Sequence, residues 1–146
     1  MIYLDTSSFL KLYVREHGSE FVQQCLEEQD QPVPIPDILR FEFLNALRLK
    51  VFWNELTDGT VDHLVALFDD RLLRGQYVVV EIDADRRIND FRNLISHSST
   101  VGCRTLDVLH VATALQLGPD RFITFDDRQR LLATAAGLPV EPAAGG

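Results

Sequence analysis

Four acidic residues stand beside short apolar segments, where an isolated charge is unfavourable. Asp5 and Asp126 each directly follow an apolar run. Glu42 and Asp107 lie inside apolar patterns with helical spacing. A carboxylate at the edge of an apolar segment is costly to remove from water unless a positive group joins it. Together the four acids predict a site for a divalent cation.

Carboxylate oxygens are hard ligands, so they suit Mg²⁺, with Mn²⁺ as the alternative ion, better than zinc. Such an ion turns a bound water into a nucleophile at neutral pH and polarises a phosphate. Phosphodiester hydrolysis can therefore run on these acids without a histidine base. Hydroxyl groups next to the acids are first expected to cap helices and second to contact metal-bound water; they are Thr6, Ser7 and Thr124.

Each acid also has a simpler structural role, and the sequence leaves these alternatives open. Asp5 suits the N-cap of a helix, and Asp126 or Asp127 suits the N-cap of the last helix. Asp107 lies near a predicted helix start, where the macrodipole favours an acid. Glu42 could be an exposed helical residue. The prediction of a metal site therefore depends on the set of acids and not on any single one.

Other catalytic and binding classes find little support. His110 lies three residues after Asp107 on the same helical face, and we predict a packing or hydrogen-bonding role for it. No Gly-x-Ser-x-Gly elbow and no glycine-rich phosphate loop is present. Cys25 and Cys103 lie far apart, which argues against a disulfide framework or a zinc site.

Length and composition predict one ordinary globular domain. The chain has 146 residues, of which 46% are hydrophobic and 25% charged. We expect a domain over residues 1–140 and a flexible tail over 141–146. No apolar stretch approaches the ~20 residues of a membrane span, and the N-terminus lacks a secretory signal. We therefore expect a cytoplasmic protein with no membrane association.

The net charge of −8 argues against a nucleic-acid partner, because such proteins favour basic surfaces. Two features weaken this objection. A bound cation would neutralise part of the excess locally, and 12 of the 14 basic residues are arginine, which suits phosphate contacts. The charge also supports an alternative, a protein-interaction module with little or no catalysis.

Short apolar strands alternate with helical patterns, which predicts an α/β fold with helices on both faces of a mostly parallel sheet of four or five short strands. The expected strands or extended segments are 2–4, 31–36, 77–82, 121–124 and 138–141. The expected helices are 7–15, 19–28 with Ser19 as its cap, 37–53, 57–73, 83–95, 105–118 and 126–136. A polar loop is expected over 96–102.

The segments that carry the acids resemble the PIN domain, specifically its VapC-like toxin branch, from Met1 to about Val140. The resemblance rests on short motifs whose order and spacing agree. They are Tyr3-Leu-Asp-Thr-Ser7, Glu42 with Asn45-Ala-Leu47, Arg104-Thr-Leu-Asp107 with His110-Val-Ala-Thr-Ala114, and Thr124-Phe-Asp126 followed by Ala135-Ala-Gly-Leu138.

The resemblance implies a three-layer PIN-like fold and a Mg²⁺-dependent endoribonuclease that is the toxin of a toxin–antitoxin pair. It further implies an RNA substrate, a small antitoxin with a basic tail and a homodimer. A DNA-directed nuclease is the remaining alternative. The metal and catalytic residues implied are Asp5, Glu42, Asp107 and Asp126, supported by Thr124 and by Thr6 or Ser7, with Asp127 as a neighbour.

Overall fold

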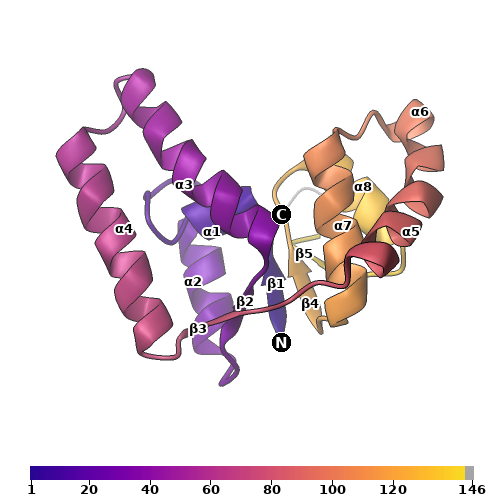
Figure 1. The fold of residues 1–146 in the computed structure, drawn as a ribbon, viewed down its shortest axis with the longest axis horizontal. Helices are drawn as coiled ribbons and strands as arrows, with labels where there is room; N and C mark the ends of the chain where they lie inside the picture. Colours follow the sequence, from indigo (N-terminus) through magenta and orange to yellow (C-terminus); the bar gives the residue numbers. More distant parts are fainter. Residues whose placement is uncertain (144–146) are drawn as a thin grey trace.

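Parallel strands run through the middle of the molecule, of which this structure, a computed structural model, describes residues 1–143. Strand β4 pairs with both β1 and β5, and β2 pairs with β3; all of these pairs are parallel. β1 also contacts β2, which gives the spatial order β3, β2, β1, β4, β5 (Figure 1). The strands are β1 (Ile2–Leu4), β2 (Val33–Ile35), β3 (Tyr77–Val79), β4 (Arg121–Ile123) and β5 (Val140–Glu141).

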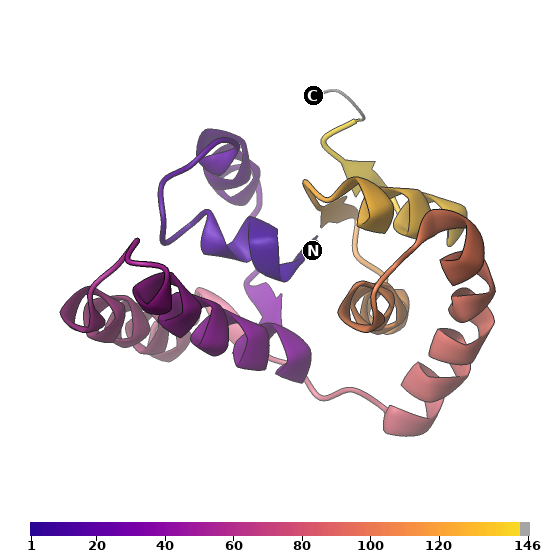
Figure 2. The ribbon, with the colours of Figure 1, turned by 90° about the horizontal axis from the view of Figure 1, so that it is seen from above.

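Helices cover the strands on two sides, α1 to α4 on the left and α5 to α8 on the right in Figure 1. Seen from above, the start of the chain lies between these two groups (Figure 2). The helices are α1 (Thr6–Leu10), α2 (Ser19–Glu27), α3 (Asp37–Phe52), α4 (Asp58–Leu73), α5 (Ala84–Leu94), α6 (Ser98–Val101), α7 (Thr105–Leu117) and α8 (Asp127–Ala135), with a 3-10 turn η1 (Ile95–His97).

The alternation of side chains along β1 divides the core into two clusters. Ile2 and Leu4 pack with the apolar side chains of α1 to α4. Tyr3 points the other way and packs with Phe122 and the apolar side chains of α5, α7 and α8. Successive residues of a strand face opposite sides of the sheet, so one short strand serves both clusters. The α/β class and the three layers are confirmed; the hydrogen-bonded ladder is interrupted between β2 and β1.

Two predicted elements are shorter than expected. Strand β3 ends at Val79 and not at residue 82, because its partner β2 ends at Ile35, the residue paired with Val79, just before Pro36. The first helix ends at Leu10 and not at residue 15. The next three residues continue in tighter turns, in which the amides of residues 11 to 13 bond the carbonyls three residues back.

Other differences are local. Gly18, with φ of 89°, is the N-cap of α2 in place of Ser19, whose hydroxyl accepts from the amide of Glu16 at 2.9 Å. The predicted polar loop folds as η1 and α6, which ends at Gly102. Of the predicted tail, Glu141 belongs to β5, and residues 144–146 lie outside the described part. No helix in residues 1–143 is long and apolar enough to span a membrane.

The pairing of β1 with β4 brings distant parts of the chain together. Leu4 lies opposite Ile123 in the register, so the residues that follow them, Asp5 and Thr124, leave the strands side by side. Loops at the carboxyl ends of parallel strands are the usual location of binding sites in α/β folds. The fold therefore places Asp5 and the segment before α8 at such an edge.

Candidate active site

Asp5 is held in place by three hydrogen bonds. Its Oδ2 accepts from the Thr124 hydroxyl at 2.6 Å. Its Oδ1 accepts from the Ser8 amide at 2.8 Å and from the Ser7 hydroxyl at 3.1 Å. Asp5 is 2% exposed and Thr124 is fully buried. The bond to Ser8 makes Asp5 the N-cap of α1, as one alternative predicted, while the bond to Thr124 joins it to the neighbouring loop.

Thr124 and Gln129 connect Asp126 and Asp107 to this position. The Thr124 hydroxyl accepts from the Asp126 amide at 3.2 Å, and Asp126 caps α8 by accepting from the Gln129 amide at 2.8 Å. The buried Gln129 side chain donates to the main-chain carbonyl of Asp107 at 3.1 Å. These bonds fix the loop before α8 against the first turn of α7.

Asp107 lies close enough to two other aspartates to be affected by their charges. The pKa of Asp107 lies above its ordinary value, first because the carboxylate is partly buried and then because Asp126 and Asp5 are nearby. The amide of Arg104, which donates to Asp107 at 3.1 Å, opposes this shift. A cation beside Asp107 would offset the effect of Asp126 and Asp5 on that carboxyl.

Asp107→Asn is expected to stabilise the metal-free protein at neutral pH. Because the folded state raises the pKa of Asp107, that carboxyl favours folding below its ordinary pKa of ~3.9, and the contribution is lost as pH rises through the folded-state pKa. The amide retains an acceptor for the Arg104 amide. Calorimetry should show a melting temperature higher by about 1–3 °C at pH 7, with the difference shrinking near pH 3. A lower melting temperature at pH 7 would contradict the raised pKa.

Glu42 forms a second group beside the aspartates. Its Oε1 accepts from the Thr6 hydroxyl at 2.7 Å and lies 2.6 Å from Nε2 of His110. Burial raises the pKa of Glu42, but the hydrogen bonds from His110 and Thr6 outweigh it and hold that pKa below its ordinary value. Glu42 is therefore ionised. The predicted hydrogen-bonding role of His110 is confirmed, and Thr6, next to Asp5 in the chain, links the two groups.

A pocket of about 490 Å³ opens beside the aspartates. Asp107, Asp126 and Asp127 line it, together with Arg104 and Arg128. Asp5 and Glu42 do not line this pocket. Neither arginine forms an ion pair with any residue in the described part of the chain, and Asp127 pairs instead with Arg130 at 2.6 Å. The pocket thus combines acids with two available guanidinium groups.

The donor set fits a hard divalent cation. Within residues 1–143, no three His, Cys, Asp or Glu side chains are grouped tightly enough to hold a metal on their own, so water would have to supply most ligands of a bound ion. Mg²⁺ takes only one or two protein carboxylates and keeps several waters. Asp107 and Asp126 line one pocket and Thr124 links Asp126 to Asp5, so these oxygen donors suit Mg²⁺ or Mn²⁺ with water completing its shell.

Two residues of this arrangement were missed by the sequence analysis. Tyr3 bonds His110 through its hydroxyl at 2.7 Å; its place two residues before Asp5, on the same side of the strand, was the available signal. Gln129 follows Asp126 by three residues, and an N-cap followed three residues later by Gln is the pattern of a capping box.

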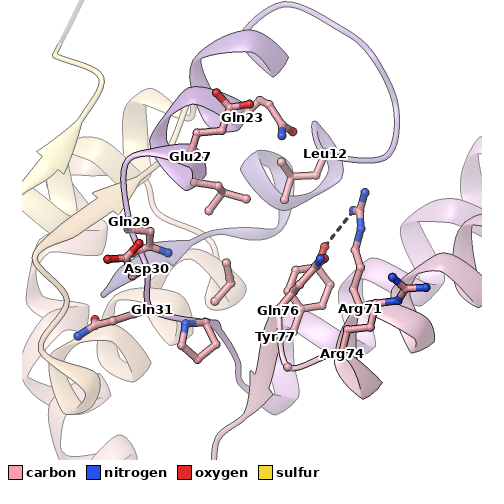
Figure 3. A pocket seen from close by; sticks show the side chains of 14 residues that line it. Leu12, Gln23, Glu27, Gln29, Asp30, Gln31, Arg71, Arg74, Gln76 and Tyr77 are labelled. Atoms are coloured by element: carbon pink, nitrogen blue, oxygen red, sulfur yellow. Dashed lines mark hydrogen bonds between the residues drawn. The ribbon is translucent and has the colours of Figure 1, made fainter.

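A separate pocket of about 520 Å³ lies at the other end of the strands (Figure 3). Its lining includes Val33 and Tyr77, the first residues of β2 and β3, and Arg71, which donates to the Tyr77 hydroxyl at 3.1 Å. None of the four acids lines it. Because the strands are parallel, this pocket and the acids lie at opposite edges, and the pocket is not part of the candidate site.

Known proteins match this chain over nearly its whole length. The PIN domain profile matches residues 2–135. Ribonuclease VapC46 of Mycobacterium tuberculosis is 34% identical over 141 residues, which is 95% of each chain. Two solved structures share the fold: VapC20 of Mycobacterium tuberculosis, a sarcin-ricin loop cleaving toxin (TM-score 0.68, 16% identity, 94% and 96% coverage), and VapBC2 of Rickettsia felis bound to a promoter DNA fragment (TM-score 0.68, 14% identity, 97% and 98% coverage). The chain belongs to the PIN domain family.

Proposed function

We propose that this protein is a Mg²⁺-dependent endoribonuclease and the toxin of a toxin–antitoxin pair. The observation that carries the proposal is the set of hydrogen bonds by which Thr124 and Gln129 link Asp5, Asp126 and the main chain of Asp107, although the three acids come from distant segments. The RNA substrate is supported by the relative named Ribonuclease VapC46, which spans 95% of both chains.

The acidic residues would have different roles in the reaction. Asp107 and Asp126 present carboxylates at the pocket, and the carboxylate of Asp5 is held by the hydrogen bond from the Thr124 hydroxyl. Glu42 adds an ionised carboxylate from α3. These acids would hold the divalent ion, and the chemistry it would supply is polarisation of the scissile phosphate and activation of a bound water as the nucleophile.

Arg104 and Arg128 are the basic residues placed to hold the RNA backbone, because both line the pocket and neither is paired within the described residues. In protein made inactive by Asp5→Asn, so that RNA stays intact, changing both to glutamine should weaken RNA binding. The slope of log affinity against log salt should become shallower by about 0.7 for each arginine lost.

Arg92→Gln is the matched control for this measurement. Arg92 lies in the last turn of α5, is likewise without an ion pair in residues 1–143, and does not line the pocket. Its substitution should leave the salt dependence unchanged. Equal effects of Arg92 and the Arg104–Arg128 pair would show that RNA binding depends on overall charge and not on this pocket.

An antitoxin with a basic tail is the expected protein partner. A cationic side chain would be attracted to the acids that line the pocket, Asp107, Asp126 and Asp127. The net charge of −8 also favours a basic partner in general. The structural likeness to VapBC2 of Rickettsia felis supports a two-component system. If so, the product of an adjacent gene should copurify with this chain and stop RNA cleavage.

A homodimer is also proposed. Exposed Phe41 on α3 and exposed Ile88 on α5 provide apolar surface, and the two helices are joined by the ion pair of Asp37 with Arg87 at 2.7 Å. Where such side chains form one continuous patch, the patch suits a subunit interface. Sedimentation of the protein at increasing concentration should show a dimer that Phe41→Asp weakens.

The direct test of the activity compares matched RNA and DNA oligonucleotides of one sequence with Mg²⁺ or with a chelator. We expect RNA to be cleaved, DNA to remain intact and the chelator to stop cleavage. Equal cleavage of DNA would favour a DNA-directed nuclease. No cleavage, together with no carboxylate-dependent heat on titration with Mn²⁺, would favour a protein-interaction module.

A further inference from the structure

Two short hydrogen bonds in series connect Tyr3, in the core, to Glu42 through His110. The Tyr3 hydroxyl lies 2.7 Å from Nδ1 of His110. The other ring nitrogen of His110, Nε2, lies 2.6 Å from Oε1 of Glu42. The three residues come from β1, α7 and α3, and the bond between His110 and Glu42 joins the two layers of helices directly.

The buried residues of this hydrogen-bond series, Tyr3 and His110, are rigidly packed. Tyr3 is fully buried and His110 is 3% exposed. The Tyr3 ring stacks on Phe122 with centroids 5.2 Å apart and meets the His110 ring edge-on at 5.9 Å. Side chains packed in this way stay in one rotamer, so the position of Nε2 is set by the core and not by solvent.

The chemistry of a carboxylate fixes the direction of the hydrogen bond between His110 and Glu42. A carboxylate oxygen can only accept, so Nε2 of His110 carries a proton and donates it to Oε1. The Tyr3 hydroxyl can both donate and accept, so it can bond Nδ1 in either protonation state of the ring. In each case Nε2 of His110 is directed at Glu42.

The hydrogen bonds make the two carboxylate oxygens of Glu42 different from each other. Both His110 and Thr6 bond Oε1, and among the described residues no hydrogen bond involves Oε2. A carboxylate with one oxygen held by two donors cannot rotate freely. Oε2 is thus left in a defined position with its full capacity to accept.

We propose that His110, oriented by Tyr3, is a positioning residue that fixes Glu42 with Oε2 as its single working oxygen toward the cation site. This inference rests on the proposed function of Glu42 in that site. Residues that hydrogen-bond a metal-binding carboxylate commonly alter metal affinity by 10–100-fold when they are lost. His110 would act only through Glu42.

The test measures Mn²⁺ affinity by calorimetry for the full chain and its variants, each checked for folding by circular dichroism. His110→Leu should weaken Mn²⁺ binding by about 10–100-fold. His110→Gln should recover most of the affinity, because the glutamine amide nitrogen can occupy the place of Nε2 and donate to Oε1. Tyr3→Phe, which keeps the ring and removes the hydroxyl, should give a smaller loss in the same direction.

Repeating the comparison in a protein that already carries Glu42→Gln separates an effect of His110 through Glu42 from a general effect on the fold. In Glu42→Gln protein, adding His110→Leu should cause no further loss of Mn²⁺ affinity, since the side chain it positions has already lost its charge. Equal losses in both backgrounds, or no recovery in His110→Gln, would overturn the inference. If His110→Leu fails to fold, the Tyr3→Phe comparison decides in the same two backgrounds.

The outcome also distinguishes this inference from the proposed function. Wild-type protein that binds no Mn²⁺ overturns the proposed function and the inference with it. Mn²⁺ binding that requires Asp5 but is indifferent to His110 and Tyr3 overturns the inference alone.

Discussion

Asp5→Asn is expected to lower the rate of RNA cleavage about a thousandfold, equivalent to ~4 kcal/mol of lost transition-state stabilisation. The substitution removes the negative charge of a residue that is 2% exposed and lies near both Asp107 and Asp126. The fold should survive, because the amide oxygen can still accept from the Ser8 amide and cap α1. The measurement is the initial rate of cleavage by purified protein with saturating Mg²⁺, together with growth inhibition in cells.

Asp127→Asn is the matched control for this result. Asp127 lines the same pocket, but its carboxylate is exposed and pairs with Arg130 at 2.6 Å. We expect cleavage to change by less than about threefold, since an exposed ion pair contributes little. Undiminished Mg²⁺-dependent cleavage by Asp5→Asn, or equal losses in the two variants, would contradict the role given to Asp5.

Phe43→Ala is expected to destabilise the fold by about 3–5 kcal/mol. Phe43 is fully buried at the centre of an aromatic cluster, with ring centroids 5.1 Å from Phe9, 4.8 Å from Tyr13 and 5.2 Å from Phe68. Its truncation leaves a cavity between α1, α3 and α4. Because Phe43 follows Glu42 on α3, the loss should also disturb the position of that carboxylate.

Chemical denaturation measures this prediction directly. The midpoint should fall without a change in slope if the unfolded state is unaffected. Phe52→Ala on the same helix is the control, because Phe52 is 79% exposed, and its loss should change stability by less than about 0.5 kcal/mol. Equal effects at the two positions would mean that α3 does not pack as described.

Local features of the fold were predictable from the sequence because their signals are local. Asp83 and Asp126 cap helices as their types and positions indicate. The predicted strand after Gly75 begins at the observed start of β3 but extends too far. The end of β3 depends on its partner strand β2 and not on its own residues. The length of β3 is set by its pairing with β2.

The candidate site was predictable as a set of residue types and less so as a set of contacts. The acids were identified from their positions beside apolar segments. The bond between Thr124 and Asp5, however, joins residues 119 positions apart, and that between Tyr3 and His110 joins residues 107 apart. Such pairs arise from strand register and helix packing, which periodicity along the chain does not reveal.

The cap alternative is confirmed at two of the acids, and a cap does not exclude the predicted ligand role. Asp5 and Asp126 each use Oδ1 as a helix cap. In Asp5 the second oxygen faces Thr124, and in Asp126 the side chain remains exposed at the pocket. Capping fixes the orientation of a carboxylate at a helix start, which is also what a metal-binding side chain requires.

The most direct test of the central claim is a crystal soaked in Mn²⁺ and measured for anomalous scattering. We predict a peak bound by the carboxylates of Asp107 and Asp126 on the side facing Asp5, and its loss in Asp5→Asn crystals. A peak held by other residues, or well-ordered acids with no ion at high Mn²⁺ concentration, would contradict the claim that these distant acids together form a cation site.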